Sequence, residues 1–158
     1  ETVEMTGIII FLIGVSSIMS WVMAFTNIPN AITELLLGIS SNPIIILLIM
    51  NLVLLIVGTF MDLTPAILIF TPIFLPIAKN FGMDSVQFGI MLIFNLCIGN
   101  ITPPVGNTLF IGCKVGKTSI EEVIKYLLPF YGGILVVLML VTFIPEISLF
   151  IPKLMGMI

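Results

Sequence analysis

Histidine is absent from the 158-residue sequence, and only 8% of the residues are charged. The lack of histidine excludes mechanisms that need an imidazole, including histidine metal sites and serine or cysteine nucleophiles activated by histidine. The scarcity of charge excludes a soluble domain, in which about 25% of residues are charged. Because 59% of the residues are hydrophobic and the mean hydropathy is +1.34, the composition is that of an integral membrane protein.

Basic residues and cysteines are also few. The five basic residues are all lysines, and no polybasic stretch is present that would bind nucleic acid or anionic lipid. Cys97 and Cys113 lie in apolar sequence and are expected to pack there rather than to form a disulfide or a metal site. We therefore expect no cofactor and no nucleic-acid partner.

The apolar runs that are present predict an all-α membrane protein. They reach the ~20 residues that a helix needs to cross the hydrocarbon, and the alternation of a β-barrel is absent. Residues 3–26 predict a first crossing with Trp21 near an interface, and residues 30–39 predict a short interfacial arm helix. The sequence starts at Glu1 without an initiator methionine or a signal peptide, so we expect it to be part of a longer chain.

A polar interruption at residues 58–65 divides two short apolar arms, 43–57 and 66–78. It contains Asp62, and a carboxylate within an apolar stretch costs about 2.5 kcal/mol or more unless it is paired or solvated. Two structures fit this pattern: a kinked double crossing with Asp62 in an external loop, or a re-entrant hairpin with Asp62 at a tip inside the protein. We favour the hairpin, because the interruption is short and rich in glycine, threonine and proline.

A second interruption, residues 99–108, reads Gly-Asn-Ile-Thr-Pro-Pro-Val-Gly-Asn-Thr. Pro103 and Pro104 have no backbone N–H, and the Pro103 ring disfavours a helical conformation at Thr102. A helix entering this segment is thus expected to end near Asn100, and a second helix to start at one of the two prolines. Such a broken helix is tolerated in a bilayer where it lines a protein-enclosed site, which makes the segment a candidate ion or substrate site.

The remaining segments complete the predicted organisation. Asp84 or Ser85 is expected to cap the helix that leads into the second interruption. An interfacial helix is predicted from residue 117, followed by a last crossing over residues 131–150. We divide the chain into a first transmembrane helix with its arm helix (1–40), a transport-domain hairpin and broken helix (41–117), and an interfacial helix with the last transmembrane helix (118–158).

Two interrupted elements in one apolar chain are typical of alternating-access transporters, in which a hairpin tip faces a broken helix. The simpler interpretation is that each is a proline kink in a packing helix. An intramembrane aspartyl protease would need two facing carboxylates, and the other candidate, Asp84, lies at a helix start. A channel would spread its polar residues along a pore, and a purely structural subunit would tolerate replacement of both interruptions.

Five short motifs resemble the C-terminal part of the large membrane subunit of tripartite ATP-independent periplasmic (TRAP) transporters. They are Gly58-Thr-Phe-Met-Asp, Thr71-Pro-Ile-Phe-Leu-Pro-Ile, Asn95-Leu-Cys-Ile-Gly, Thr102-Pro-Pro-Val-Gly and Leu128-Pro-Phe. The resemblance implies an elevator-type importer in the bacterial inner membrane that couples sodium to the uptake of an organic acid, such as a dicarboxylate, a sugar acid or sialic acid. It also implies three partners: the remainder of the large subunit, a small membrane subunit and a soluble periplasmic binding protein.

The same resemblance assigns roles to particular residues. Only the second of the family's two inverted repeats is matched, so the other half-site is expected elsewhere. The residues implied to bind one sodium ion are Gly58, Thr59, Met61, Asp62, Gly99, Thr102, Pro103 and Gly106. Sodium is a hard cation that prefers oxygen ligands, which agrees with this set. Asn107 and Thr108 are candidates for contact with the substrate or, alternatively, for capping the second half of the broken helix.

Overall fold

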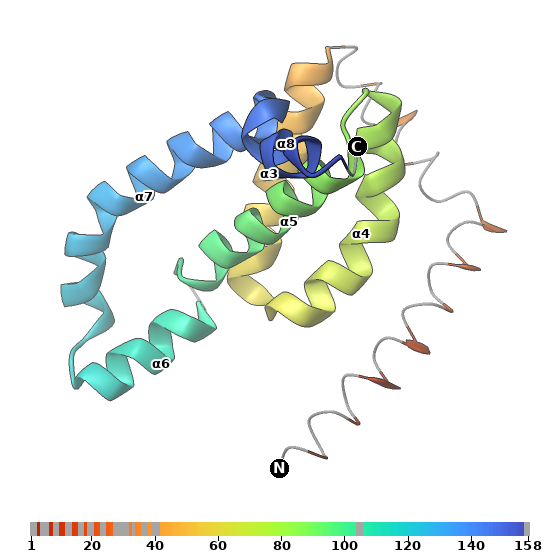
Figure 1. The fold of residues 1–158 in the computed structure, drawn as a ribbon. Helices are drawn as coiled ribbons and strands as arrows, with labels where there is room; N and C mark the ends of the chain where they lie inside the picture. The colour runs from red at the N-terminus through yellow and green to blue at the C-terminus, as the bar shows by residue number, and fades with distance from the viewer. Residues whose placement is uncertain are drawn as a thin grey trace.

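The computed structural model describes residues 42–103 and 106–156, together with scattered positions before residue 42. Its described part is helical, without strands, and the all-α prediction is confirmed. The helices in order (Figure 1) are α3 (Pro43–Phe60), α4 (Leu63–Asn80), α5 (Ser85–Asn100), α6 (Asn107–Gly116), α7 (Ile120–Phe143) and α8 (Pro145–Leu154). The predicted crossing at 3–26 and arm helix at 30–39 fall mostly outside the described residues.

Helices α3 and α4 form a hairpin whose turn is shorter than the sequence predicts. The side chain of Asn42 caps α3 by accepting a hydrogen bond of 3.0 Å from the N–H of Ile44, and only Met61 and Asp62 separate the two helices. The prediction of an interruption over residues 58–65 is therefore wrong in extent. The last turn of α3 closes through a 2.9 Å bond from the Met61 N–H to the Val57 carbonyl, and a proline in the first turn of α4 needs no intrahelical donor.

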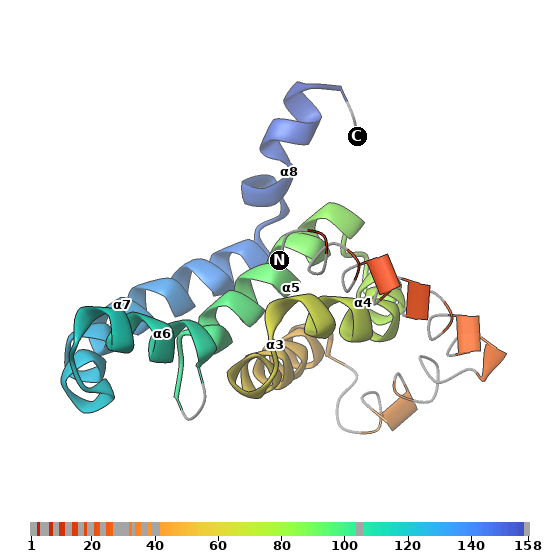
Figure 2. The ribbon, with the colours of Figure 1, turned by 90° about the horizontal axis from the view of Figure 1, so that it is seen from below.

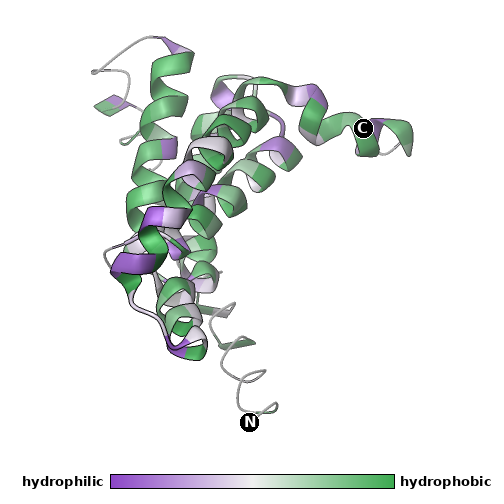
Figure 3. Cartoon of the chain, turned by 90° about the vertical axis from the view of Figure 1, so that its left-hand side faces the viewer, coloured by the Kyte–Doolittle hydropathy of each residue, from purple (hydrophilic) through white to green (hydrophobic). Residues whose placement is uncertain are grey.

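Among the described helices, α3, α4 and α7 are long and apolar enough to cross a membrane. Figure 3 shows apolar residues over most of their length. With 18 residues each, α3 and α4 are longer than the arms predicted at 43–57 and 66–78. Both a re-entrant hairpin and a pair of membrane crossings are compatible with these two helices. The position of the turn in or outside the bilayer distinguishes the two.

Cysteine labelling of the complete permease, freed of its native cysteines, locates the hairpin turn. Cysteines at Asn80 and Thr118, both exposed, are expected to react with an impermeant thiol reagent from opposite sides of the membrane. A cysteine at Thr64 is expected to react poorly. Because Thr64 is itself exposed in this structure, its protection would come from the bilayer or the rest of the subunit. Strong labelling at Thr64 in every transport state would instead place the turn in open water.

Helix α5 lies at the centre of the fold and packs against α3, α4, α7 and α8, as Figures 1 and 2 show. Asp84 caps it by accepting a 2.7 Å hydrogen bond from the Val86 N–H, and it ends at Asn100; both predictions are confirmed. Its buried residues form one core with those of its neighbours. The fully buried large apolar side chains of this core are Ile46, Met50, Leu54, Ile77, Phe88, Met91, Leu92, Leu96 and Leu138.

The second half of the broken helix starts later than predicted. Helix α6 begins at Asn107 rather than at Pro103 or Pro104. Gly106 precedes it with φ 47° and ψ 70°, a left-handed conformation that breaks the helical path and suits glycine.

The predicted last crossing over residues 131–150 is also corrected by the structure. Helix α7 is continuous from Ile120, capped by Ser119, to Phe143, so the interfacial helix and the crossing are one element. It stops there because Ile144, the residue before Pro145, is extended with φ −114° and ψ 95°, as residues before proline prefer. Helix α8 then leaves the bundle in a new direction (Figure 2).

Candidate functional site

Two glycines let the backbones of α3 and α5 touch just before each helix ends. A Cβ atom added at Gly99 would lie 2.5 Å from the Cα and carbonyl carbon of Gly58 and 2.9 Å from the carbonyl oxygen of Leu55. A Cβ added at Gly58 would lie 3.1 Å from the Gly99 Cα. Any larger residue at Gly99 would therefore push the helices apart, and the glycine pair holds the two helix ends together.

A backbone hydrogen bond joins the two interruptions directly. The N–H of Gly106 donates to the carbonyl of Thr59 across 3.2 Å. Glycine is also sterically required at this position, since a Cβ there would lie 2.9 Å from the Thr102 carbonyl oxygen. The structure thus brings the last turn of α3, next to the hairpin turn, to the break between α5 and α6.

Two threonine hydroxyls lie near this contact between α3 and the break that follows α5. Thr59 Oγ1 donates to the Ile56 carbonyl at 2.7 Å, and Thr102 Oγ1 donates to the Ile98 carbonyl at 2.6 Å. Each hydroxyl proton is held by the helix's own backbone, which leaves the oxygen lone pairs to accept a hydrogen bond or to ligate a cation. Both side chains line the same cavity.

Both threonines line one cavity of about 480 Å³ between α3, α5 and α7. Its walls are mainly apolar, and they consist of Leu55, Ile56, Thr59, Phe60, Ile98, Gly99, Thr102, Pro103, Tyr131 and Leu135. Of the predicted sodium ligands, the cavity contains Thr59, Gly99, Thr102 and Pro103. The remaining four lie outside its lining.

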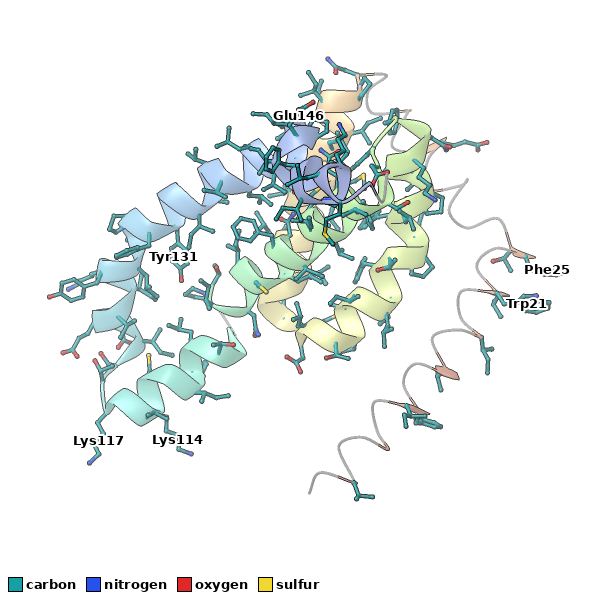
Figure 4. The ribbon with its side chains drawn as sticks, viewed as in Figure 1. Trp21, Phe25, Lys114, Lys117, Tyr131 and Glu146 are labelled. Atoms are coloured by element: carbon teal, nitrogen blue, oxygen red, sulfur yellow. The ribbon has the colours of Figure 1, made fainter. Side chains whose placement is uncertain are left out.

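Tyr131 is a residue of this site that the sequence analysis missed. Its hydroxyl donates a 2.6 Å hydrogen bond to the carbonyl of Ile101, so α7 holds the backbone immediately after the end of α5. Figure 4 shows the side chain reaching from α7 toward that end. In the sequence, Tyr131 is noticeable only as a tyrosine within the apolar stretch that follows Pro129. No spacing rule connects it with Ile101, 30 residues earlier in the chain.

Met61 and Asp62 form the hairpin turn itself. Met61 is half-buried and Asp62 is exposed. The Asp62 carboxylate makes no capping hydrogen bond to α4, and no ion pair or hydrogen bond connects it to another described residue. The carboxylate is accessible and has no partner among the described residues, in contrast to the buried position expected for it.

Thr108, one of the two candidate substrate residues, lines a different cavity from the threonine pair. Asn107 is the first residue of α6, and Gly106 is its cap, so neither Asn107 nor Thr108 caps the second half-helix. Thr108 is exposed and lines a separate cavity of about 270 Å³ with Ile101, Leu109, Gly112, Cys113, Val123 and Leu127. The chain alone does not bring Thr108 to the cavity that contains Thr59 and Thr102.

A buried amide cluster ties the same three helices together farther from the contact between α3 and the break that follows α5. Asn51, Asn95 and Thr142 are 2%, 0% and 2% exposed. Asn51 Nδ2 donates to Thr142 Oγ1 at 3.2 Å, and Asn95 Nδ2 donates to Asn51 Oδ1. Gln87, also buried, donates from Nε2 to the Thr142 carbonyl at 2.9 Å. The cluster links α3 and α5 to α7 and fixes their relative positions.

Most of the donor groups near the contact between α3 and the break that follows α5 are neutral oxygens, and the Asp62 carboxylate lies in the adjoining turn. Among the described residues, no three His, Cys, Asp or Glu side chains come together as a metal site. A cation at this contact would therefore be held mainly by carbonyl and hydroxyl oxygens, which are ligands that hard cations accept.

Comparison with known proteins agrees with this geometry. Residues 1–147 match the family model described as "Tripartite ATP-independent periplasmic transporter, DctM component". The chain is 51% identical over 98% of its length to YgiK, an uncharacterised protein of Salmonella typhimurium, of which it covers 35%. It is 38% identical over 96% of its length to the C4-dicarboxylate TRAP transporter large permease protein DctM of Vibrio cholerae, and covers 34% of it.

A third relative, the sialic acid TRAP transporter large permease protein SiaM of Vibrio cholerae, is 34% identical over 98% of this chain, which covers 36% of it. The chain thus spans about a third of the length of these relatives. No solved structure matches it significantly. Since the family model matches residues 1–147, which include both interrupted elements, the chain belongs to the DctM family of large TRAP transporter permeases.

Proposed function

We propose that this chain provides one half-site of a sodium-coupled importer of an organic acid. The observation that carries the proposal is the hydrogen bond between Gly106 and Thr59, which joins the last turn of α3, next to the hairpin turn, to the break between α5 and α6. Near this bond α3 and α5 end and α4 and α6 begin, and we call this region the junction. A sodium ion would lie there, ligated by carbonyls and by the hydroxyls of Thr59 and Thr102, with Asp62 supplying negative charge nearby.

The directions of the helices support separate sites for a cation and an anion. Helices α3 and α5 end at the junction, and the carbonyl ends of helices carry partial negative charge that favours cations. Helices α4 and α6 begin beside it, at Leu63 and Asn107, and their N–H ends favour anions. One junction therefore offers both signs of charge, which is the arrangement that coupled transport of a cation and an organic anion requires.

The class of substrate is inferred from chemistry and from relatives. Two related permeases are named for C4-dicarboxylate and sialic acid, both of which carry carboxylates, and α6 presents its N-terminus with Asn107 and Thr108. We assign this chain the same class, a dicarboxylate, sugar acid or sialic acid. The periplasmic binding protein of the system would deliver the substrate.

The transporter would be completed by its partners. The chain covers about a third of its relatives, so the remainder of the large subunit would supply the other inverted repeat and the second half-site. A small membrane subunit would join it in the bacterial inner membrane. Transport would follow an elevator mechanism, in which the hairpin and broken helix move together.

The test is the sodium dependence of uptake by the complete transporter in proteoliposomes. Asp62→Asn is expected to insert and fold normally, because the carboxylate is exposed and uncapped, while half-maximal uptake shifts to higher sodium concentration. Thr102→Val, which removes one hydroxyl ligand, is expected to shift it in the same direction by less. Uptake is measured at a series of sodium concentrations with saturating binding protein and substrate.

Glu146→Gln is the matched control, since Glu146 is an exposed acidic residue in the first turn of α8, at the other end of the molecule from Lys114 and Lys117 (Figure 4). It is expected to leave the sodium dependence unchanged. Unaltered sodium dependence in both Asp62→Asn and Thr102→Val would refute a cation site at this junction. Uptake that needs no sodium in the unmodified transporter would refute the coupling itself.

A further inference from the structure

We propose that α8 is an interfacial anchor, which lies in the membrane surface and inserts one side into the outer part of the bilayer. The inference concerns a short helix for which the sequence analysis expected part of a crossing. It does not depend on sodium coupling or on the class of substrate.

Helix α8 has three chemically distinct sides. The first faces the protein: Ser148 and Leu149 are buried and Pro152 is half-buried, where α8 packs against α5 and α7. The second is a stripe of exposed apolar side chains with helical spacing, between 50% and 77% exposed. This apolar stripe consists of Ile147, Phe150, Ile151, Leu154 and Met155.

The third side is charged. Glu146 and Lys153 are both exposed and stand seven residues apart, which is about two helical turns, so they share one edge of α8. This charged edge adjoins the apolar stripe. A helix with one apolar and one charged side at a membrane is suited to the boundary between hydrocarbon and headgroups.

The position of α8 in the chain places it at such a boundary. Helix α7 is apolar and long enough to cross the bilayer, and its exposed apolar residues continue to Phe143. Helix α8 begins directly after it and projects from one end of the bundle (Figures 2 and 3). Figure 4 places Glu146 at the opposite end of the molecule from Lys114 and Lys117. The stripe therefore continues the surface of α7 where the chain leaves the hydrocarbon.

A helix with the apolar stripe and charged edge of α8 is unfavourable both in water and at the centre of the bilayer. In water, five neighbouring apolar side chains would stay hydrated, which is unfavourable. The 10-residue helix is only about 15 Å long and cannot cross the hydrocarbon. At the interface, the stripe enters the acyl region while the Lys153 ammonium reaches the lipid phosphates by extending its alkyl chain.

Site-specific fluorescence in the complete permease tests this placement. In a background without other cysteines, single cysteines at Ile151 on the stripe, Lys153 on the charged edge and Leu149 on the inner side are labelled with an environment-sensitive fluorophore. The permease is reconstituted in phosphatidylcholine vesicles that contain a spin-labelled lipid, with the quencher either near the headgroup or at the end of the acyl chain. Iodide serves as the aqueous quencher.

The Ile151 label is expected to be quenched severalfold more by the shallow lipid quencher than by iodide, and more than by the deep lipid quencher. The Lys153 label is expected to respond mainly to iodide, and the Leu149 label to respond weakly to all three. A label at Phe150, the neighbouring stripe position, is expected to repeat the result for Ile151. Circular dichroism confirms that each labelled protein is folded.

Three results would overturn the proposal. Iodide quenching at Ile151 equal to that at Lys153 would place the stripe in water. Protection of Ile151 and Phe150 from all quenchers would mean that protein covers the stripe, either the rest of the large subunit or the small subunit. Stronger quenching by the deep lipid quencher would make α8 part of a crossing.

Discussion

Gly99→Ala is expected to separate α3 from α5 and to abolish transport. The added Cβ would lie 2.5 Å from the Cα and carbonyl carbon of Gly58, and these backbone atoms cannot rotate away as a side chain could. Overpacking in a close-packed contact costs about 1–3 kcal/mol, which exceeds the gain of about 1 kcal/mol from replacing glycine in a helix. The hydrogen bond between Gly106 and Thr59 would lengthen as the helices separate, so the junction would lose its geometry.

Other glycines provide graded comparisons for Gly99→Ala. Gly58→Ala is expected to be milder, because its Cβ would meet the nearest atoms at 3.1 Å, a distance that a shift of a few tenths of an ångström relieves. Gly89→Ala is the matched control on the same helix, since a Cβ at Gly89 meets nothing within 4 Å. It is expected to keep full transport and to be neutral or slightly stabilising.

The measurements are the unfolding temperature of the purified complete permease and its uptake activity in proteoliposomes. The expected order of damage is Gly99→Ala, then Gly58→Ala, then Gly89→Ala. Wild-type stability and uptake in Gly99→Ala would show that α3 and α5 do not approach as closely in the complete transporter. Equal damage by Gly99→Ala and Gly89→Ala would indicate that the loss comes from glycine replacement in α5 in general.

The sequence predicts the elements that obey local rules. The proline pair after Thr102 predicted the end of α5 at Asn100, and the capping preference of aspartate predicted the start of the same helix. Apolar length predicted a last helix long enough to cross a membrane, although its bounds are Ile120–Phe143 rather than residues 131–150. These features depend on backbone donors, steric clashes and hydrophobicity over a few neighbouring residues, all of which can be derived without knowledge of the fold.

The features that the sequence does not predict depend on contacts between distant segments. The start of α6 is set by Gly106, whose left-handed conformation accompanies a bond to Thr59 in another helix. Residues 58–60 remain helical because the glycine packs against α5 instead of breaking α3. Tyr131 contributes through a backbone carbonyl in a distant loop. In each case tertiary packing decides between local conformations that the sequence leaves similarly plausible.

The exposed position of Asp62 is another feature that the sequence did not predict. Its isolation among apolar residues predicted a buried carboxylate, but the sequence alone does not decide whether a protein partner, water or an ion compensates the charge. The structure of this chain provides no protein partner among the described residues. The compensating group must then come from solvent, from a bound cation or from the rest of the transporter, which the sodium titration of Asp62→Asn examines.

Asn95→Leu is expected to destabilise the permease by leaving a buried partner without its donor, although it also removes the buried Asn95 Oδ1, which has no hydrogen-bond partner among the described residues. Asn95 is completely buried, and its side-chain amide donates to Asn51 Oδ1 and, at 3.1 Å, to the Met91 carbonyl. Leucine has a similar size, so the loss would come mainly from the unpaired Asn51 oxygen. A buried polar group without a partner costs about 1–3 kcal/mol, whereas an intact hydrogen bond within a membrane protein contributes about 0.6 kcal/mol on average.

This asymmetry makes the double variant informative. In Asn51→Leu/Asn95→Leu, both partners of the bond are apolar, so the double variant is expected to be less destabilised than the sum of the two single variants. The coupling free energy of this cycle measures how much the hydrogen bond between Asn51 and Asn95 contributes to stability. Asn80→Leu, at an exposed position at the end of α4, controls for the general effect of replacing asparagine by leucine.

Unfolding free energies of the complete permease in a fixed detergent or lipid provide the four values of this cycle. Additive effects of Asn51→Leu and Asn95→Leu would show that the two amides act independently. The hydrogen bond from Asn51 to Thr142 of α7 provides a third variant, whose loss of stability can be compared with that of Asn95→Leu. Thr142→Val removes the acceptor of one Asn51 hydrogen, but the same amide still donates to the Leu47 carbonyl at 2.9 Å. Thr142→Val should therefore cost less than Asn95→Leu, and a larger loss would move the centre of the cluster from the α3–α5 contact to α7.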